Sequence, residues 1–326
     1  PHPPIYQKHG CMLEHAAAVK SVVGIPVIAV GRLDDPAVAT EALENDKCDI
    51  VAIARGLLAD EAWATKVSEN KASEIRPCIG CYEGCIKRND ENLPYSCAVN
   101  PRCARDLFFT SSSTQTSKKV LIIGAGMAGM QAALECKAKG HKVTLVEKGD
   151  RVGGLVNWGA IPGLKDDLRK LIDWYQEQLQ LNNIHIQFGK EVTEKSIEET
   201  STDVIILATG SSPIIPPFPG VNLPLVKNCL EALEKPHAVG KCPIIVGGGI
   251  TGCEIAMYLA SLGKKVTIVE MRSQLMMPEM PPVMIWKYVN DFLSHYSVNI
   301  YTDWAVENIE QDGLICRRPK SQESTK

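Results

Sequence analysis

An internal repeat constrains the fold of this chain of 326 residues more than any other feature. The stretch KKVLIIGAGMAGMQAALECKAKGHKVTLVEK (118–148) is matched by KCPIIVGGGITGCEIAMYLASLGKKVTIVEM (241–271). Each copy has a short apolar run, a glycine-rich turn, a helical stretch, a glycine, and a second apolar run that reaches a glutamate. This order is typical of a β-α-β unit. The sequence therefore predicts an α/β fold that contains two Rossmann-like dinucleotide-binding units.

The glycine-rich turns have the G-x-G-x-x-G spacing of a dinucleotide-binding loop. Such glycines permit a tight turn, close approach of a pyrophosphate, and packing of helix against strand. An acid at the end of the second strand can accept a hydrogen bond from a ribose 2′-hydroxyl. The candidate cofactor-binding residues are Gly124, Gly126, Ala128, Gly129 and Glu147 in the first copy, and Gly247, Gly249, Gly252 and Glu270 in the second.

Flanking features separate the two copies. The first is followed by KGDRVGG, which ends at Gly154, and later by DVIILATGSSPIIPP, which contains Gly210. These features accompany the first copy only, and they favour FAD there and a nicotinamide nucleotide in the second unit. Glu270 would repel the 2′-phosphate of NADPH, so NADH is favoured, whereas the neighbouring Arg272 argues in the opposite direction.

Four of the twelve cysteines form a dense group in CIGCYEGCIKRNDENLPYSC, with C-x2-C-x3-C-x11-C spacing. Thiolates suit zinc, copper(I) and iron–sulfur clusters. A structural zinc site usually takes two C-x2-C pairs from separate knuckles, whereas three close cysteines and a later fourth suit a cubane cluster. The candidate metal ligands are Cys78, Cys81, Cys85 and Cys97, with a [4Fe–4S] cluster favoured and zinc as the alternative.

Two apolar segments near the start, GIPVIAVGRL (24–33) and CDIVAIARGLL (48–58), are expected to be strands covered on both faces. The helix expected between them has Asp34 or Asp35 as its cap and Pro36 in its first turn. This pattern predicts two strand–helix repeats of a parallel (β/α)8 barrel or sheet. Loops after the last two strands of such a barrel commonly bind phosphate, so the pairs Gly31-Arg32 and Arg55-Gly56 are candidates for that role.

Composition excludes several function classes. The formal net charge of −3 gives no electrostatic basis for binding nucleic acid or an anionic membrane. No apolar run reaches the roughly 18 residues that a membrane span needs. Because the remaining cysteines are scattered, a reducing cytoplasm is favoured over a disulfide-rich secreted class.

These features predict six segments. They are two strand–helix repeats (1–76), which the resemblance described next implies to be strands 7 and 8 at the end of an FMN-binding barrel, a [4Fe–4S] segment (77–107), a linker (108–118), an FAD-binding domain (119–212), a connection (213–240) and an NAD(P)-binding domain (241–326).

The order of these segments resembles the old-yellow-enzyme-like NADH:flavin oxidoreductases with an iron–sulfur centre. That family includes 2,4-dienoyl-CoA reductase, the clostridial enoate reductases, the bile-acid-inducible flavoenzymes and trimethylamine dehydrogenase. The resemblance is carried by IPVIAVGRLDDP, DIVAIARGLLAD, IRPCIGCYEGC, SCAVNP and VLIIGAGMAGMQAA. It covers the chain to about Ile315.

The resemblance implies a set of cofactor-binding residues and an electron path. It implies that the FMN phosphate is held by Gly31, Arg32, Ala54 and Arg55, the cluster by the four cysteines, and FAD by Gly126, Gly129, Glu147, Gly154 and Val192. Electrons would pass from NADH to FAD, to the cluster, to FMN, and then to an activated C=C bond of a 2-enoate or 2,4-dienoyl-CoA type substrate. A flavin can collect electrons that a cluster passes singly.

Members of this family are longer, so we expect this chain to be an internal piece that is inactive alone. The tyrosine or histidine that protonates the substrate would lie outside the printed sequence, and the catalytic residues stay unknown. Two alternatives are an electron-transfer or diaphorase module and amine oxidation of the trimethylamine dehydrogenase type. Glu270 and the intact second loop argue against amine oxidation. We expect an unsaturated small molecule as substrate, and homo-oligomerisation of the full-length protein is left open.

Overall fold

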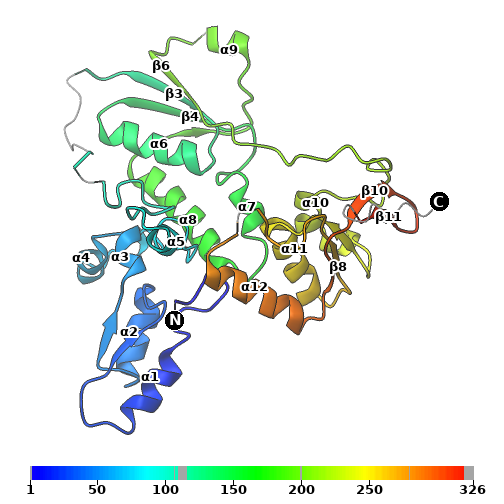
Figure 1. Ribbon diagram of the computed structural model, residues 1–326. Coiled ribbons are helices and arrows are strands. Elements are labelled where there is room, and N and C mark those ends of the chain that lie inside the picture. Colours follow the sequence, from blue (N-terminus) through cyan, green and yellow to red (C-terminus); the bar gives the residue numbers. More distant parts are fainter. Residues whose placement is uncertain (1, 106, 109–115, 199, 279, 319–326) are drawn as a thin grey trace. The chain divides into compact units, whose positions relative to one another are not determined.

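The computed structural model describes residues 2–105, 107–108, 116–198, 200–278 and 280–318 (Figure 1). It divides into two compact units, Pro1–Ser211 and Ser212–Lys326, which are described separately below. Most of the linker predicted at 108–118 lies outside the described residues. In the part of the chain that is described, no helix is long and apolar enough to cross a bilayer.

The first unit begins with two short parallel strands, β1 (Ile28–Val30) and β2 (Ile50–Ala52), in which Ala29 pairs with Val51. Buried Leu33 and Cys48 help to form a small core beside them. The helices of this part are α1 (Leu13–Lys20), α2 (Pro36–Glu44), α3 (Arg55–Ala59), α4 (Trp63–Ser68), the 3-10 turn η1 (Ala72–Glu74) and α5 (Ile86–Asp90).

Helix α2 begins as the sequence predicts. Asp35, one of the two candidate caps, accepts a hydrogen bond from the backbone N–H of Ala37, and Pro36 is the first helical residue. The strand predicted over residues 48–58 is wrong beyond Ala52, because α3 begins at Arg55. An apolar run marks burial, and burial continues through this turn into the helix.

The rest of the first unit is a four-stranded parallel sheet with the order β5-β4-β3-β6. Its strands are β3 (Lys119–Ile123), β4 (Lys142–Val146), β5 (Ile186–Gln187) and β6 (Val204–Leu207). Its helices are α6 (Met127–Ala138), α7 (Val156–Gly159), α8 (Asp166–Leu181) and α9 (Glu194–Glu198). This arrangement confirms the first β-α-β unit.

The core of the first unit lies between this sheet and its helices. Ile122 of β3, Met130 of α6 and Leu145 of β4 are fully buried. Helix α6 lies along the sheet in Figure 1, and α8 packs against α6. Trp174 and Tyr175 of α8 are also buried and pack in this core.

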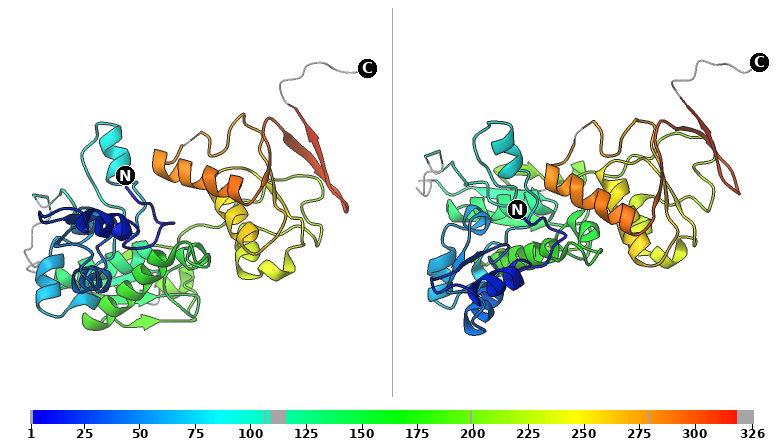
Figure 2. Two further views of the ribbon diagram at one scale, coloured as in Figure 1. Left: turned by 90° about the horizontal axis from the view of Figure 1, so that it is seen from below. Right: turned by 60° about the horizontal axis from the view of Figure 1, so that its bottom comes forward.

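The second unit repeats the β-α-β plan with three parallel strands in the order β7-β8-β9. They are β7 (Ile244–Val246), β8 (Thr267–Val269) and β9 (Asn299–Tyr301). Helix α10 (Cys229–Glu234) and the 3-10 turn η2 (Pro236–Ala238) precede β7, whereas α11 (Ile250–Ser261) and α12 (Val283–His295) join the strands. Figure 2 shows α12 (orange) beside α11 (yellow). An antiparallel hairpin that the sequence reading missed, β10 (Ala305–Ile309) and β11 (Leu314–Arg317), follows.

Candidate functional site

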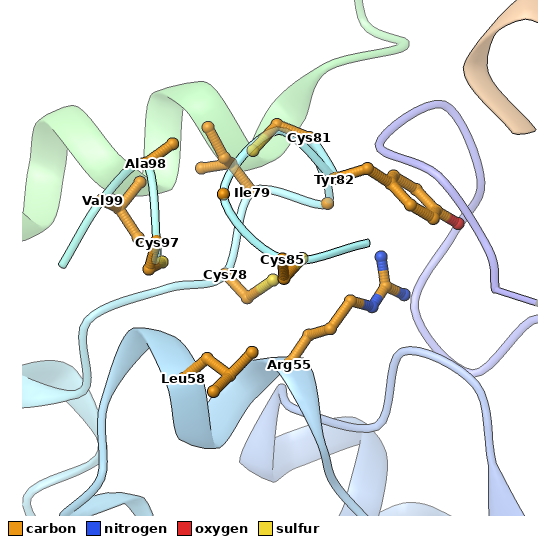
Figure 3. Close-up of a pocket in the computed structure, with 12 residues that line it drawn as sticks. Arg55, Leu58, Cys78, Ile79, Cys81, Tyr82, Cys85, Cys97, Ala98 and Val99 are labelled. Carbon is orange, nitrogen blue, oxygen red and sulfur yellow. The ribbon is translucent and has the colours of Figure 1, made fainter. Parts of the chain in front are cut away.

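The four candidate cysteines line one cavity in the first unit (Figure 3). Cys78 and Cys97 come from the two ends of the segment, and Cys81 and Cys85 come from the turn before α5. The other residues of the wall are Arg55, Leu58, Ile79, Gly80, Tyr82, Gly84, Ala98 and Val99. Cys103 is buried and does not line the cavity, so the structure brings together the four cysteines that the spacing singles out.

The four cysteines are the sulfur donors that the cavity offers to a metal group. Among the described residues, no group of three or more histidine, cysteine, aspartate or glutamate side chains is already gathered around a single metal position. Four cysteine thiolates are the donor set of a tetrahedral zinc site and also of a [4Fe–4S] cluster.

Two glycines allow the cysteine segment to fold tightly. Gly80 has a φ of +62°, and a β-carbon there would lie 2.9 Å from the backbone nitrogen of Ile5. At Gly84 a β-carbon would lie 2.6 Å from the carbonyl oxygen of Ser96. The backbone N–H of Ser96 in turn donates to Gly84 O at 2.7 Å. The two glycines thus allow separate stretches of backbone to lie close together, and the contact of Gly84 with Ser96 sets the position of Cys97.

Burial favours the neutral form of three of the cavity's thiols. It raises the pKa of Cys78 to about 12 and that of Cys81 to about 11, and it also raises the pKa of Cys85. A thiolate in such a place needs positive charge close by, and a coordinated metal supplies it by deprotonating the thiol.

Arg76 ties the cysteine segment to the neighbouring helices. Its backbone N–H donates to Asp60 Oδ2 at 2.8 Å, and its guanidinium donates to the carbonyl oxygen of Val99. The same guanidinium lies 4.4 Å from the ring of Trp174 and 3.3 Å from Gln131 Oε1. Both ends of the cysteine segment are thereby fixed to α6 and α8, which belong to the first dinucleotide-binding unit.

Arg55 and Tyr82 form the side of the cavity nearest to the start of the chain. The guanidinium of Arg55 lies 4.8 Å from the centre of the Tyr82 ring. Its Nη2 donates to the carbonyl oxygen of Pro3 at 2.9 Å. In the described part of the chain, Arg55 Nη1 and the Tyr82 hydroxyl are both buried and have no hydrogen-bond partner. Burial raises the pKa of Tyr82 to about 12.

The Gly31-Arg32 pair lies in a turn with left-handed backbone angles, φ +130° and +54°. The Arg32 guanidinium is buried and donates to the carbonyl oxygens of Pro4, Ile5 and Gln7 and to the carboxylate of Asp167 on α8. Its side chain is therefore engaged by protein groups, and a role in phosphate binding stays a prediction for this turn. Ala54, also expected at the phosphate, is the residue that precedes α3.

Asp167 is a buried charge that the sequence reading missed. Its Oδ1 lies 2.8 Å from His9 Nε2, and its Oδ2 accepts from Arg32. Burial alone would raise the pKa of Asp167, but the hydrogen bond with His9 and the charge of Arg32 outweigh it and lower the pKa below its ordinary value. No local pattern could reveal this pair, because Arg32 and Asp167 are 135 residues apart.

The two glycine-rich loops have the same internal geometry. Gly124 and Gly247 both adopt left-handed angles, φ +104° and +103°. A β-carbon at Gly129 would lie 1.8 Å from Gly124 O, and one at Gly252 would lie 2.0 Å from Gly247 O. Ala128 lies in the first turn of α6, which Gly126 precedes, and Gly249 precedes α11 in the same way.

The two glutamates that follow these loops also take equivalent places. Glu147 accepts from the backbone N–H groups of Ala125 and Gly149, and Glu270 accepts from those of Gly248 and Arg272. A carboxylate has about four acceptor sites, so each glutamate retains capacity for a ribose hydroxyl. Each also fixes the loop to which the pyrophosphate would bind.

Of the three additional residues predicted for FAD, Gly154 lies against the first loop. A β-carbon at Gly154 would lie 3.1 Å from the Cα of Gly126, so these two glycines face each other closely. Gly210 follows Ala208, whose carbonyl oxygen lies against Gly124. Val192 is half-buried in the loop after β5. The first loop is therefore enclosed by backbone that a larger side chain would displace, as an adenine dinucleotide cradle requires.

Comparison with known proteins finds two families along the chain. Residues 118–324 match the family described as pyridine nucleotide-disulphide oxidoreductase, and residues 5–74 match the NADH:flavin oxidoreductase / NADH oxidase family. Cinnamate reductase of Clostridium sporogenes is 40% identical, with 84% of this chain and 41% of that protein covered. Bilirubin reductase of Mediterraneibacter gnavus is 30% identical, with 95% and 49% covered.

A solved structure supports the same relationship. The complex of 2-naphthoyl-CoA reductase with 2-naphthoyl-CoA matches with a TM-score of 0.91 at 27% identity, over 98% of this chain and 48% of that one. Histamine dehydrogenase of Rhizobium sp. 4-9 matches with a TM-score of 0.84 at 21% identity, which shows the fold alone. The chain spans about half or less of the length of each of these relatives.

Proposed function

This chain belongs to the pyridine nucleotide-disulphide oxidoreductase family and to the flavoenzymes related to 2,4-dienoyl-CoA reductase, and from this we propose the function of the full-length protein. It is an NADH-dependent flavoenzyme that reduces an activated C=C bond of a 2-enoate or enoyl-CoA type substrate. The order of carriers that we propose is NADH, FAD, a [4Fe–4S] cluster and FMN. When bound, these groups supply hydride transfer and the passage of single electrons.

One observation carries this proposal: the cysteine cavity shares a core with the first dinucleotide-binding unit. Cys78, Ile79 and Cys97 pack against the buried cluster that contains Ala59 of α3 and Met130 of α6. A group held by the four cysteines would therefore be covered by both the 5–74 segment and the proposed flavin unit. This shared core supports the proposal that the cysteines hold a carrier between FAD and FMN.

The chain's own residues have separate tasks in this scheme. The four cysteines would hold the cluster, and Gly124, Gly126, Gly129, Glu147 and Gly154 would bind FAD. Gly247, Gly249, Gly252 and Glu270 would bind the nicotinamide nucleotide, and the turns at Gly31 and Ala54 would bind the FMN phosphate. Each long helix that follows a glycine loop offers its N-terminal N–H groups to a pyrophosphate.

The proposal is tested by measuring anaerobic NADH oxidation by the full-length protein with and without a 2-enoate. We expect NADH to be consumed only when the enoate is present, in amounts that match its reduction. Oxidation of NADH by an artificial one-electron acceptor, with no reduction of any enoate or enoyl-CoA, would instead support a diaphorase. Reduction of the cofactors by an amine and not by NADH would support amine oxidation.

A matched pair of variants tests the cysteines. Cys85→Ser removes a sulfur of the cavity, whereas Cys103→Ser changes a buried cysteine outside it. We expect Cys85→Ser to abolish NADH-dependent enoate reduction and to retain much of the electron transfer from NADH to an artificial acceptor. Cys103→Ser should retain both activities. Full enoate reduction by the Cys85→Ser protein would contradict the proposed carrier.

A further inference from the structure

Trp158 of α7 has an indole N–H that the protein itself leaves unused. Its Nε1 is buried and has no hydrogen-bond partner among the residues that the structure describes. The indole N–H of Trp174 on α8, by contrast, donates to Glu74 O at 2.9 Å. A buried donor without an acceptor costs free energy. The N–H of Trp158 therefore indicates an acceptor that a ligand supplies.

The position of Trp158 associates this donor with the first glycine-rich loop. Helix α7 begins two residues after Gly154, and a β-carbon at Gly154 would lie 3.1 Å from the Cα of Gly126. Helical side chains lean toward the N-terminus of their helix, so the indole leans toward the turn that contains Gly154. The guanidinium of Arg151, which precedes this turn, lies 5.8 Å from the centre of the indole ring and agrees with that direction.

The backbone that carries Trp158 is fixed at both ends of α7. At its start, Asn157 Nδ2 donates to Gly154 O at 3.1 Å, which joins the helix to the turn. At its end, Arg169 Nη2 of α8 donates to Ala160 O at 2.8 Å. The indole is therefore held in place by the protein, so little ordering is needed when a ligand binds.

We infer that the indole N–H of Trp158 donates a hydrogen bond to an oxygen of the FAD held by the first loop, which makes Trp158 a further FAD-binding residue. This inference rests on the FAD that the proposed function assigns to that loop. FAD carries oxygen acceptors in its pyrophosphate and in its flavin ring, and an indole can donate but not accept. The exposed cation of Arg151 beside the ring favours the same anionic ligand.

The inference predicts different effects in the FAD-free and the FAD-bound protein. Without FAD the N–H of Trp158 has no partner, so its removal should cost no stability. With FAD, the same removal leaves an oxygen of the cofactor without its donor. A role in packing alone would lower the stability of both forms, so the comparison separates binding from packing.

The test is made on the full-length protein, from which FAD is removed and to which it is added back, with FMN and iron measured in each sample. Trp158→Phe keeps an aromatic ring and removes the N–H. We expect its Kd for FAD to rise about tenfold through the loss of one hydrogen bond. The denaturant midpoint of the FAD-free protein should stay unchanged. Trp158→His restores a ring N–H and should recover part of the affinity.

Trp174→Phe is the matched control. It makes the same change of side chain in the same unit, at an indole N–H that already has Glu74 O as its acceptor. This variant should lower the denaturant midpoint of the FAD-free protein, because a hydrogen bond within the protein is lost. Its Kd for FAD should stay unaltered.

Two results would overturn the inference. The first is an unchanged Kd for FAD in Trp158→Phe. The second is a lower denaturant midpoint, or failure to fold, of the FAD-free Trp158→Phe protein, because the indole would then act through packing. Each of these results leaves the proposed function intact. An unaltered full-length protein that binds no FAD would instead refute the proposed function and this inference with it.

Discussion

The two glycine-rich loops share one internal design but have different surroundings. In both loops the first glycine has a left-handed φ, and its carbonyl oxygen lies against the third glycine, in the helix that follows. In both, a glutamate accepts hydrogen bonds from two backbone N–H groups. In the first unit, however, a β-carbon at Gly124 would lie 2.3 Å from Ala208 O. At Gly247 no described atom would lie within 4 Å of such a β-carbon.

This difference separates contacts that belong to the β-α-β unit from contacts that neighbouring segments add. The close contact of helix and loop is common to both loops, so it is a property of the β-α-β unit. Ala208, which follows β6, and Gly154 lie against the first loop. At the second loop a β-carbon at Gly248 would lie 2.4 Å from Leu275 Cδ2, and Gly248 O accepts from the backbone N–H of Met276 at 2.7 Å. Neighbouring segments therefore cover both loops, at different glycines.

The largest expected effect concerns the contacts that tie the first unit together. Asp167→Ala removes one partner of a buried ion pair and leaves Arg32 with an uncompensated charge. Breaking such a pair costs about 3–5 kcal/mol. We expect hydrogen exchange to become faster in the first unit and to stay unchanged in the second, as measured by mass spectrometry. Equal changes in both units would contradict the separation that we infer.

The same carboxylate predicts a dependence of stability on pH. The pKa of Asp167 is lowered in the folded protein, so its contribution is present above the unfolded pKa of about 3.9. The contribution is lost as the pH falls through the lower, folded pKa. In Asp167→Asn this carboxylate no longer titrates. The free energy of unfolding of the first unit should therefore fall less steeply below about pH 4 than it does in the unaltered protein. Denaturant unfolding at several pH values measures this.

The next effect compares the loops directly. Gly124→Ala places a methyl group against Ala208 O, in addition to the backbone strain that Gly247→Ala shares. We expect a loss of about 1 kcal/mol in unfolding free energy for Gly247→Ala and about 3 kcal/mol or more for Gly124→Ala. FAD content should fall in the Gly124→Ala protein and stay unchanged in the Gly247→Ala protein.

Gly129→Ala and Gly252→Ala provide the matched controls. Both β-carbons would meet the carbonyl oxygen of the first glycine at nearly the same distance. These two substitutions should therefore destabilise their own units to similar extents. A large inequality between them would show that the loops differ in their internal packing as well as in their surroundings.

The smallest effect concerns the glutamates. Glu270→Gln should raise the KM for NADH about tenfold and reduce the preference over NADPH, because one charged acceptor for a ribose hydroxyl is weakened. Glu147→Gln should leave the KM for NADH unchanged and weaken FAD retention. Steady-state kinetics and flavin release during dilution measure the two outcomes. A shift of the KM for NADH in Glu147→Gln would reverse the assignment of the two loops.

Local chemistry made much of the fold predictable. The two β-α-β units and the cap of α2 by Asp35 follow from glycine spacing and capping. The end of β2 did not follow, because the apolar run continues across the turn into α3. The hairpin β10–β11 was not predicted, because it lies outside the repeated segments on which the prediction of the second unit was based.

The candidate site shows the same division. Spacing alone singled out the four cysteines that share the cavity. Tyr82 and the partner of Arg32 on α8 could not be recognised, because their roles depend on contacts between distant segments. The sequence identifies the four cysteines as metal donors, and the fold shows that Arg55 is the charged side chain among the described residues of their cavity.

Metal and sulfide analysis of anaerobically purified full-length protein tests the central claim most directly. Our account predicts about four iron atoms and about four acid-labile sulfides per chain, lost together in Cys85→Ser and retained in Cys103→Ser. One zinc per chain without iron or sulfide, or protein free of all three, would contradict it.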